Sequence, residues 1–256
     1  MTSSSLFPSP PPRSFPPTPF GLRRASAPLR MTEKNAHQLI ESILFSRGSY
    51  HFLADHLHRL SASANYFQYP CDLSTVRAAL EREACLLNPG SAYKVRLLLS
   101  VDGSLVMAHE RVQPKSKMRR PVLIAATPVL SSDPWLYHKT TQRNVYDAAR
   151  KDAQAQGFFD VLFQNERGDI TESSIANVFI QLDGQWLTPP VHCGLLNGVY
   201  RQHLLKKLKP VQEKAFSENE LLRADRVLLC NSVRGVIRVR LSGVMRDSEI
   251  LSRIDT

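Results

Sequence analysis

The sequence predicts an α+β or α/β fold with two lobes. Apolar runs of strand length alternate with amphipathic helical segments along most of its 256 residues, and no apolar run approaches the roughly 20 residues that span a bilayer. A chain of this length buries one large core or two smaller cores that meet at a cleft. The order of the segments favours a small lobe over residues 31–125 and a larger lobe over residues 126–256.

The expected small lobe contains two hairpins and two helices. The runs LIESILF and YHFL, joined at Arg47–Gly48, predict two strands, and AYKVRLLLSVDGSLVMAHERV predicts two more. Between them, LADHLHRLSASANYF has leucines at helical spacing, and LSTVRAALEREACLL is amphipathic and ends before a Pro-Gly stop. Lys94 and Arg96 share one face of their strand, as a solvated face or as a site for an acidic substrate.

The expected larger lobe begins with the strand PVLIAATPVL, which is followed by a helix from Thr140 or Thr141 to Gly157. The segment FFDVLFQNERGDITESSIANVFIQLDGQWLTPP predicts three strands, with ITESSIANVFIQL as the middle one. A helix then starts after Asn197–Gly198, and ADRVLLCN predicts a further strand. Lys139 thus lies where a strand leads into a helix.

Residues 1–30 differ from the rest of the chain. They are rich in proline, serine and arginine and contain no acidic residue, a composition that predicts a disordered tail. The prolines break the amphipathic helix of a mitochondrial import signal, so the tail is either an over-extended start before Met31 or a targeting segment. Four cysteines without a CxxC pair are typical of a reducing compartment, and we expect a cytoplasmic protein.

The chain carries 33 Lys and Arg against 23 Asp and Glu, a formal charge of +10. Such a charge suits nucleic acid, an anionic membrane or small acidic ligands. The charges are dispersed, and the densest cluster, KSKMRR at 115–120, lies between two prolines in a predicted solvated loop. Aromatic residues are not interleaved with bases as in single-strand-binding proteins. We expect no nucleic-acid or membrane partner, and a non-catalytic anion- or nucleic-acid-binding protein is an alternative.

Two residues of the expected larger lobe suit an amine-to-carbonyl cofactor. Lys139 follows the apolar residues 135–137, where partial burial lowers the pKa of an amine and prepares it to condense with an aldehyde. Glu172 lies in the polar stretch TESS within an apolar ladder, and a buried carboxylate needs a cationic partner such as a protonated ring nitrogen. Taken alone, the two positions are better explained as a surface lysine and a hairpin-edge glutamate, so neither residue by itself indicates a cofactor.

A possible phosphate site lies further along the chain. A glycine at a helix entrance, here Gly198, lets the N–H groups of Val199 and Tyr200 approach a phosphate closely. Asn231 and Ser232 follow a predicted strand and offer further hydrogen bonds. In the small lobe, His56 and His58 point to different helix faces, so we expect no metal site. Arg59, beside core-facing leucines, reaches either solvent or an anion between the lobes.

Taken in order, the motifs HKTTQR, ERGDITESSIANVF, LTPP and GLLNGVYRQ resemble the class IV aminotransferase family. The resemblance covers roughly residues 38–240 and implies the two-lobed fold type IV, the D-amino acid aminotransferase-like fold of enzymes that use pyridoxal 5'-phosphate (PLP). Within the family, LIESI, HLHRLSASANYF, YHKTTQR and TESSIANV are most similar to the 4-amino-4-deoxychorismate lyases. Asn144 stands where branched-chain aminotransferases have a tyrosine, five residues after the lysine.

The resemblance implies a role for single residues. Lys139 matches the lysine that bonds to the cofactor and moves the proton, and Glu172 matches the carboxylate on the pyridine nitrogen. Arg59 matches an arginine that binds the cofactor phosphate. Further cofactor contacts are expected at Val199, Tyr200, Asn231 and Ser232, and substrate contacts at Glu41, Ser42, Lys94 and Arg96.

The resemblance also implies an activity. It indicates a PLP-dependent lyase that converts 4-amino-4-deoxychorismate to 4-aminobenzoate and pyruvate in folate biosynthesis. A homodimer is expected, together with a separate aminodeoxychorismate synthase that supplies the substrate. The alternative is a PLP-dependent class IV aminotransferase that acts on D-amino or branched-chain amino acids, because the two activities share every cofactor contact and differ in the substrate pocket.

Overall fold

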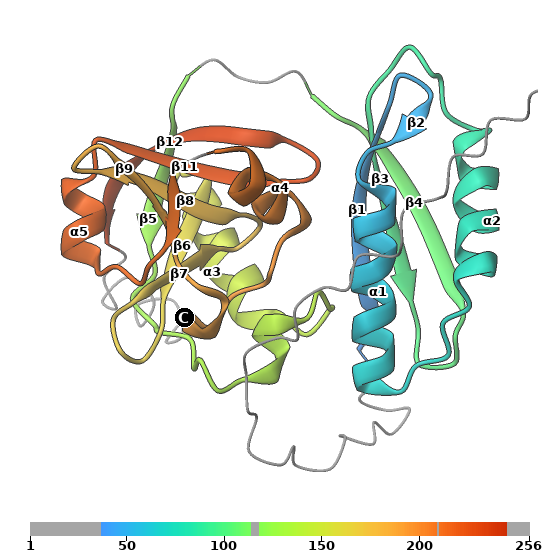
Figure 1. Ribbon diagram of the computed structural model, residues 1–256, viewed down its shortest axis with the longest axis horizontal. Coiled ribbons are helices and arrows are strands. Elements are labelled where there is room, and N and C mark those ends of the chain that lie inside the picture. The colour runs from blue at the N-terminus through green and yellow to red at the C-terminus, as the bar shows by residue number, and fades with distance from the viewer. Residues whose placement is uncertain (1–36, 114–117, 209, 245–256) are drawn as a thin grey trace, which may run out of the picture.

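The computed structural model describes residues 37–113, 118–208 and 210–244, which fold into two lobes that lie side by side (Figure 1). Residues 1–30, the expected tail, and residues 115–117 of the basic loop lie outside this part of the chain. Each lobe has its own sheet, one of four strands and one of eight. The predicted mixture of strands and helices in two lobes is therefore confirmed.

The small lobe is an antiparallel sheet with helices packed on one face. Its strands, in the order β2-β1-β3-β4, are β1 (Leu39–Ser46), β2 (Ser49–Tyr50), β3 (Tyr93–Leu99) and β4 (Leu105–Arg111), and its helices are α1 (Leu53–Phe67) and α2 (Leu73–Ala84). Because strand side chains alternate, Leu39 and Ile43 of β1 pack with Leu57 and Leu60 of α1 in one core. The intervening residues of β1 and β3 form the opposite face, which is turned toward the larger lobe.

The larger lobe is built on a mixed sheet in the order β10-β9-β8-β11-β12-β5-β6-β7. Its strands are β5 (Arg120–Ile124), β6 (Asp160–Gln164), β7 (Ile170–Ser173), β8 (Asn177–Leu182), β9 (Gln185–Thr188), β10 (Val211–Glu213), β11 (Arg226–Asn231) and β12 (Gly235–Val244). β7 also pairs with β8, through Glu172 and Asn177, so the sheet closes on itself. Val122, Ile180 and Leu229 pack together in its core.

Three helices cover this sheet. α3 (Asn144–Ala155) buries Ala153 against the β5 and β6 side chains, α4 (Val199–Lys207) packs Leu204 against β8 and β11, and α5 (Glu218–Arg223) inserts Leu221 into the main core. Short 3-10 helices, η2 (Pro134–Tyr137) and η3 (Val191–Cys193), shape two connections. α4 lies on the side of the small lobe (Figure 1), where Phe52 meets the ring of His203 edge-on at 4.7 Å between ring centres.

Two element boundaries differ from the prediction. α3 begins at Asn144 rather than at one of the preceding threonines, because Thr140 is still extended and pairs with Leu39 of β1. β5 pairs in parallel with β6 and β12, so it belongs to the larger sheet, as expected for the strand PVLIAATPVL, and the small lobe ends before the expected boundary at residue 125. The lysine therefore lies on an extended segment several residues before the helix.

The predicted strand ITESSIANVFIQL is in fact two strands. The chain turns between β7 and β8, where the N–H and the hydroxyl of Ser173 both donate to the Ala176 carbonyl oxygen, at 2.8 and 3.0 Å. No glycine or proline marks this turn in the sequence. As a consequence, Glu172 lies at the edge of the turn and not in the middle of a strand.

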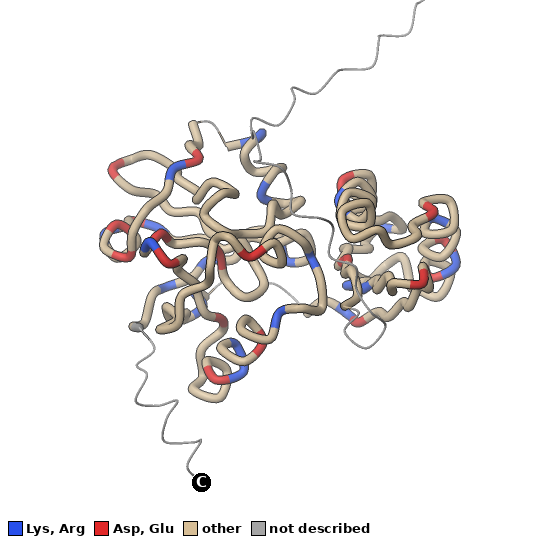
Figure 2. The backbone as a smooth tube through the Cα atoms, turned by 90° about the horizontal axis from the view of Figure 1, so that it is seen from below, with Lys and Arg blue, Asp and Glu red and all other residues tan. Residues whose placement is uncertain are grey.

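Acidic and basic residues occur along both lobes (Figure 2), which agrees with the dispersed charge of the sequence. Within the described ranges, no helix has both the length and the apolar character that crossing a membrane requires. Cys71, Cys85, Cys193 and Cys230 are all free thiols.

Candidate active site

The segment that carries Lys139 joins the two lobes. The N–H of Ile40 donates to the Lys139 oxygen at 2.8 Å, and the N–H of Thr141 donates to the Gln38 oxygen at 2.9 Å. The lysine segment thus extends the main-chain hydrogen bonds of β1, although it is about a hundred residues away in the chain. The backbone of the lysine is fixed at the interface of the lobes.

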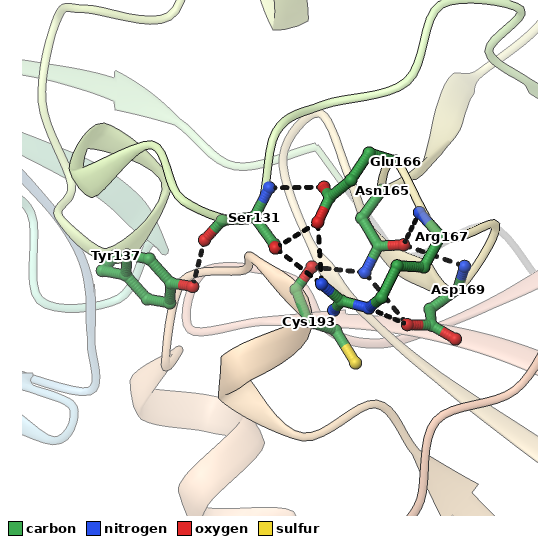
Figure 3. Close-up of polar contacts among 7 residues, drawn as sticks. All are labelled: Ser131, Tyr137, Asn165, Glu166, Arg167, Asp169 and Cys193. Carbon is green, nitrogen blue, oxygen red and sulfur yellow. Dashed lines mark hydrogen bonds and ion pairs between the residues drawn. The ribbon is translucent and has the colours of Figure 1, made fainter. Parts of the chain in front are cut away.

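The loop before Lys139 is held from the side of the larger lobe by a polar cluster (Figure 3). Glu166, in the turn between β6 and β7, accepts the N–H and the hydroxyl of Ser131 at 2.7 and 2.6 Å. Arg167 donates to the Ser131 hydroxyl oxygen at 2.9 Å and to Glu166 at 2.7 Å. Tyr137 donates its hydroxyl to the Ser131 carbonyl oxygen at 2.6 Å. These bonds leave the lysine segment little freedom to move.

Lys139 carries an amine suited to bonding with an aldehyde. Burial, aided by the positive charges of Arg59 and Arg143, lowers the pKa of Lys139 from 10.5 to about 7, against the opposing charges of Glu41 and Glu172. A substantial fraction of the amine is therefore neutral near pH 7, and the neutral amine is the nucleophile. The partial burial expected from the neighbouring apolar residues has the predicted effect.

Glu172 lines the same cleft and is 8% exposed. Its carboxylate accepts the N–H of Leu196 at 3.1 Å and the side-chain amide of Asn177 at 3.0 Å. Burial raises the pKa of Glu172 to about 7, although the Leu196 hydrogen bond and the charge of Lys139 favour the anion. It forms no ion pair within the described part of the chain. A cation brought against this carboxylate would offset the cost of burying it.

Arg59 lines the cleft from α1 and is held by a buried carboxylate. Its Nε and Nη2 donate to Glu41 at 2.8 and 2.7 Å, and His56 Nδ1 lies 2.6 Å from the same carboxylate. Burial alone would raise the pKa of Glu41, but Arg59 and His56 lower it from 4.5 to about 2. Glu41 therefore differs from the expected substrate contact: strand alternation turns it toward α1, where it orients Arg59, while Ser42 faces the cleft.

The entrance of α4 forms another part of the cleft wall. Gly198 is the N-cap, and a Cβ at this position would meet Asn177 Oδ1 at 2.1 Å, so a side chain there would displace the Asn177 amide from its contacts with Glu172 and Leu196. Val199 and Tyr200 are the first helical residues and line the cleft. N–H groups of a first helical turn lack intrahelical acceptors and attract anions. Buried Ser232 lines the same cleft.

Asn231 also lines the cleft, but its side chain is engaged in the turn after β11. Its Oδ1 accepts the N–H groups of Val233 and Arg234 at 3.1 and 2.8 Å, and its Nδ2 donates to Ile175 at 3.2 Å. These contacts support a role of Asn231 in shaping the loop and leave the hydroxyl group of Ser232 as the side-chain donor for a ligand.

One cleft, of about 410 Å³, brings the predicted site residues together. It is lined by Ser42, Arg59, Lys94, Arg96, Lys139, Glu172, Val199, Tyr200, Asn231 and Ser232. Glu41 does not line the cleft, but it accepts a hydrogen bond from Arg59, which does. No group of three or more His, Cys, Asp or Glu residues in the described ranges is arranged to hold a metal ion.

Sequence reasoning missed Tyr146 and Asn177. Tyr146 lines the cleft from α3, with its hydroxyl 3.5 Å from Glu172, and burial together with Glu172 raises the pKa of Tyr146 well above its usual value. Asn177 bridges Glu172 and the Leu196 oxygen, to which it donates at 2.8 Å. The available signal for Tyr146 was a lone aromatic ring in the polar segment NVYDAARKDAQA.

Comparison with known proteins decides the family. The model of the family described as amino-transferase class IV matches residues 38–241. The chain belongs to this family. A Schizosaccharomyces pombe protein named "Putative aminodeoxychorismate lyase" is 32% identical over 213 residues, which cover 81% of this chain and 90% of that protein.

Solved structures share the fold. The crystal structure of a "Putative amino-acid aminotransferase" from Mesorhizobium loti has a TM-score of 0.76 at 32% identity, over 80% of this chain and 100% of that one. A "hypothetical aminotransferase" from Mycobacterium tuberculosis, in its PLP-bound form, has a TM-score of 0.70 at 22% identity, over 85% of this chain and 87% of that one. The expected class IV family and its fold type IV architecture are confirmed.

Enzymes of the class IV family depend on PLP, and the cleft fits that cofactor. Lys139 would offer an amine with a lowered pKa to the aldehyde, and Glu172 would offer the ring nitrogen a buried carboxylate that has no cationic partner among the described residues. Arg59 and the amides at the entrance of α4 would be the donors for the phosphate. A Cβ on Gly198 would clash with Asn177, which donates to Glu172. The absence of a side chain at Gly198 therefore keeps the entrance of α4 close to Glu172.

Proposed function

We propose that the chain is a PLP-dependent lyase that converts 4-amino-4-deoxychorismate to 4-aminobenzoate and pyruvate. The observation that carries this proposal is the small-lobe wall of the cleft, where Lys94 and Arg96 lie. The substrate has two carboxylates, which cations bind well, whereas a branched-chain amino acid needs an apolar wall. The name of the Schizosaccharomyces pombe relative supports the same activity.

Each cleft residue then has a chemical task. PLP, when bound, acts as an electron sink for the carbon that carries the substrate amine. A substantial fraction of Lys139 is neutral near pH 7, and this neutral amine removes the proton from that carbon. Glu172 keeps a proton on the pyridine nitrogen, and Arg59, oriented by Glu41, holds the phosphate. Loss of the enolpyruvyl group as pyruvate leaves an aromatic ring, which makes the reaction favourable.

The test is an assay of the protein reconstituted with PLP. We expect pyruvate and 4-aminobenzoate to form in equal amounts from 4-amino-4-deoxychorismate, and no turnover with Lys139→Ala. The same preparation is tested with a panel of amino donors and keto acids. If the protein transfers amino groups between members of this panel but releases no 4-aminobenzoate, the lyase proposal is contradicted and an aminotransferase activity is established.

That second candidate is an aminotransferase on the same scaffold. It is favoured by the Mesorhizobium loti structure, which is 32% identical and is described as an amino-acid aminotransferase. Asn144 argues against the branched-chain subgroup, because it replaces the tyrosine expected there by resemblance. A non-catalytic protein that binds nucleic acid is disfavoured by the dispersed charges and by a buried lysine with a lowered pKa.

The proposal extends to the setting of the enzyme. We infer a homodimer, which light scattering tests, and a separate aminodeoxychorismate synthase that supplies the substrate. We also infer a cytoplasmic, reducing compartment, supported by free thiols at all four cysteines. Fluorescent tagging of the full chain and cell imaging test this location.

A further inference from the structure

The cleft contains more positive than negative side chains. Besides Lys139, its cations are Arg59, Lys94, Arg96, Arg143, Arg150 and Arg234, and its acidic residues are Glu110, Asp147 and Glu172. They come from both lobes: Arg96 lies on β3, Arg150 lies on α3, and Arg234 follows β11 in the turn to β12. This excess of positive charge is larger than is needed to bind the single phosphate of the cofactor.

Most of these cations already have partners in the protein. Lys94 donates to Glu110 at 2.8 Å, Arg143 pairs with Asp147 at 2.7 Å, and Arg59 pairs with Glu41. Arg150 lies 3.7 Å from the buried carboxylate of Asp160. In contrast, the guanidinium groups of Arg96 and Arg234 make no ion pair and no hydrogen bond with any described residue.

Arg96 and Arg234 line the same cleft from opposite lobes, Arg96 from β3 and Arg234 from the turn between β11 and β12. After the hydrogen bond from Lys94, the charges of both arginines contribute to lowering the pKa of Glu110, so both lie near that carboxylate. Arg234 is exposed at the cleft, and desolvation of its guanidinium group together with the nearby charge of Arg150 lowers its pKa. The position of Arg234 is fixed by its N–H, which donates to Asn231 Oδ1 at 2.8 Å.

We propose that Arg96 and Arg234 form a carboxylate subsite that selects dicarboxylic substrates. The inference rests on the proposed lyase function. The ring carboxylate of 4-amino-4-deoxychorismate is para to the reacting amine, so it points away from Lys139 when the amine is at the lysine. Guanidinium groups bind carboxylates through paired hydrogen bonds, whereas an apolar side chain would leave both cations unpaired. The subsite therefore separates this substrate from branched-chain amino acids.

Chorismate is a suitable probe. It has the same two carboxylates as the proposed substrate but a hydroxyl group in place of the amine, so it binds without reacting. Calorimetric titration of the PLP-loaded protein with chorismate is compared for the wild type, Arg96→Gln and Arg234→Gln. We expect the Kd to rise about tenfold or more in each variant, because each loses a charge-assisted hydrogen bond. The KM for 4-amino-4-deoxychorismate should rise similarly, with little change in kcat.

Arg238→Gln is the matched control, because Arg238 is an exposed arginine of β12 outside the cleft. It should leave the Kd for chorismate unchanged, and the PLP absorbance band should be intact in all three variants. If the wild-type protein has lyase activity but the Kd for chorismate is unchanged in Arg96→Gln and Arg234→Gln, the subsite is overturned and the proposed function stands. If the wild-type protein has no lyase activity but chorismate binds more weakly to Arg96→Gln and Arg234→Gln, the proposed lyase function is overturned and the subsite is supported.

Discussion

Replacing Glu41 by glutamine should lower the free energy of unfolding and weaken the binding of PLP through its phosphate. Glu41 is 1% exposed, and its pKa is lowered from 4.5 to about 2, which corresponds to roughly 3 kcal/mol of folding free energy at neutral pH. Because the folded-state pKa is lowered, this stability is present above pH 4.5 and is lost as the pH falls toward 2. Arg59 and His56 would also lose their anionic partner, so we expect a loss of about 3–5 kcal/mol in the free energy of unfolding.

Urea unfolding followed by circular dichroism measures the first effect. The second is measured by titrating the apoprotein with PLP and with pyridoxal, which lacks the phosphate. Glu41→Gln should weaken the binding of PLP more than that of pyridoxal, because Arg59 loses its orientation. Lowering the pH of the wild type should reproduce the loss of stability, while the variant should respond less.

Glu83→Gln is the control for this experiment. Its carboxylate also lies 2.6 Å from a histidine Nδ1, that of His109, but this pair is partly exposed. We expect it to change the free energy of unfolding by less than about 1 kcal/mol. Equal destabilisation by the two variants, or an unchanged ratio of PLP to pyridoxal affinity in Glu41→Gln, would refute the reasoning.

Three further predictions concern the cleft. The rate at which the apoprotein takes up PLP, followed by absorbance, should rise with pH through about 7 as Lys139 loses its proton, and a rise that continues toward pH 10.5 would contradict the lowered pKa. Gly198→Ala places a Cβ 2.1 Å from Asn177 Oδ1, so it should lower the free energy of unfolding by about 1–3 kcal/mol and weaken binding when the apoprotein is titrated with PLP. A PLP affinity equal to that of the wild type would show that the helix entrance tolerates a side chain. Tyr146→Phe removes a hydroxyl that favours the anion of Glu172, so the acid limb of the kcat–pH profile should move to higher pH, and an unmoved limb would exclude this contact from the mechanism.

Local sequence patterns predicted the elements that depend on local spacing. The segment LADHLHRLSASANYF coincides with α1 (Leu53–Phe67), because its leucines recur on one face and its first residue follows a tight turn at Phe52. The start of α4 after Gly198 was also predictable, because Asn197–Gly198 directly precedes apolar residues at helical spacing. In both cases the determining contact lies within the element or beside it.

Features that depend on distant pairing were not predictable in this way. The turn between β7 and β8 has no glycine or proline, and it forms because β8 must pair with β11. The orientation of Glu41 follows from which face of β1 the helix α1 covers, and that packing involves residues far along the chain. Strand alternation separates Glu41 from Ser42, but it does not say which of them faces the cleft.

The main-chain bond between Ile40 and the carbonyl of Lys139 restricts how the enzyme can admit its substrate. Separating the lobes at that edge would pull directly on the backbone of the reactive residue. A lobe motion that keeps this bond would pivot about β1 and open the opposite rim of the cleft while the amine stays in place. A ligand should consequently enter from the rim, and release of product need not disturb the geometry of the lysine.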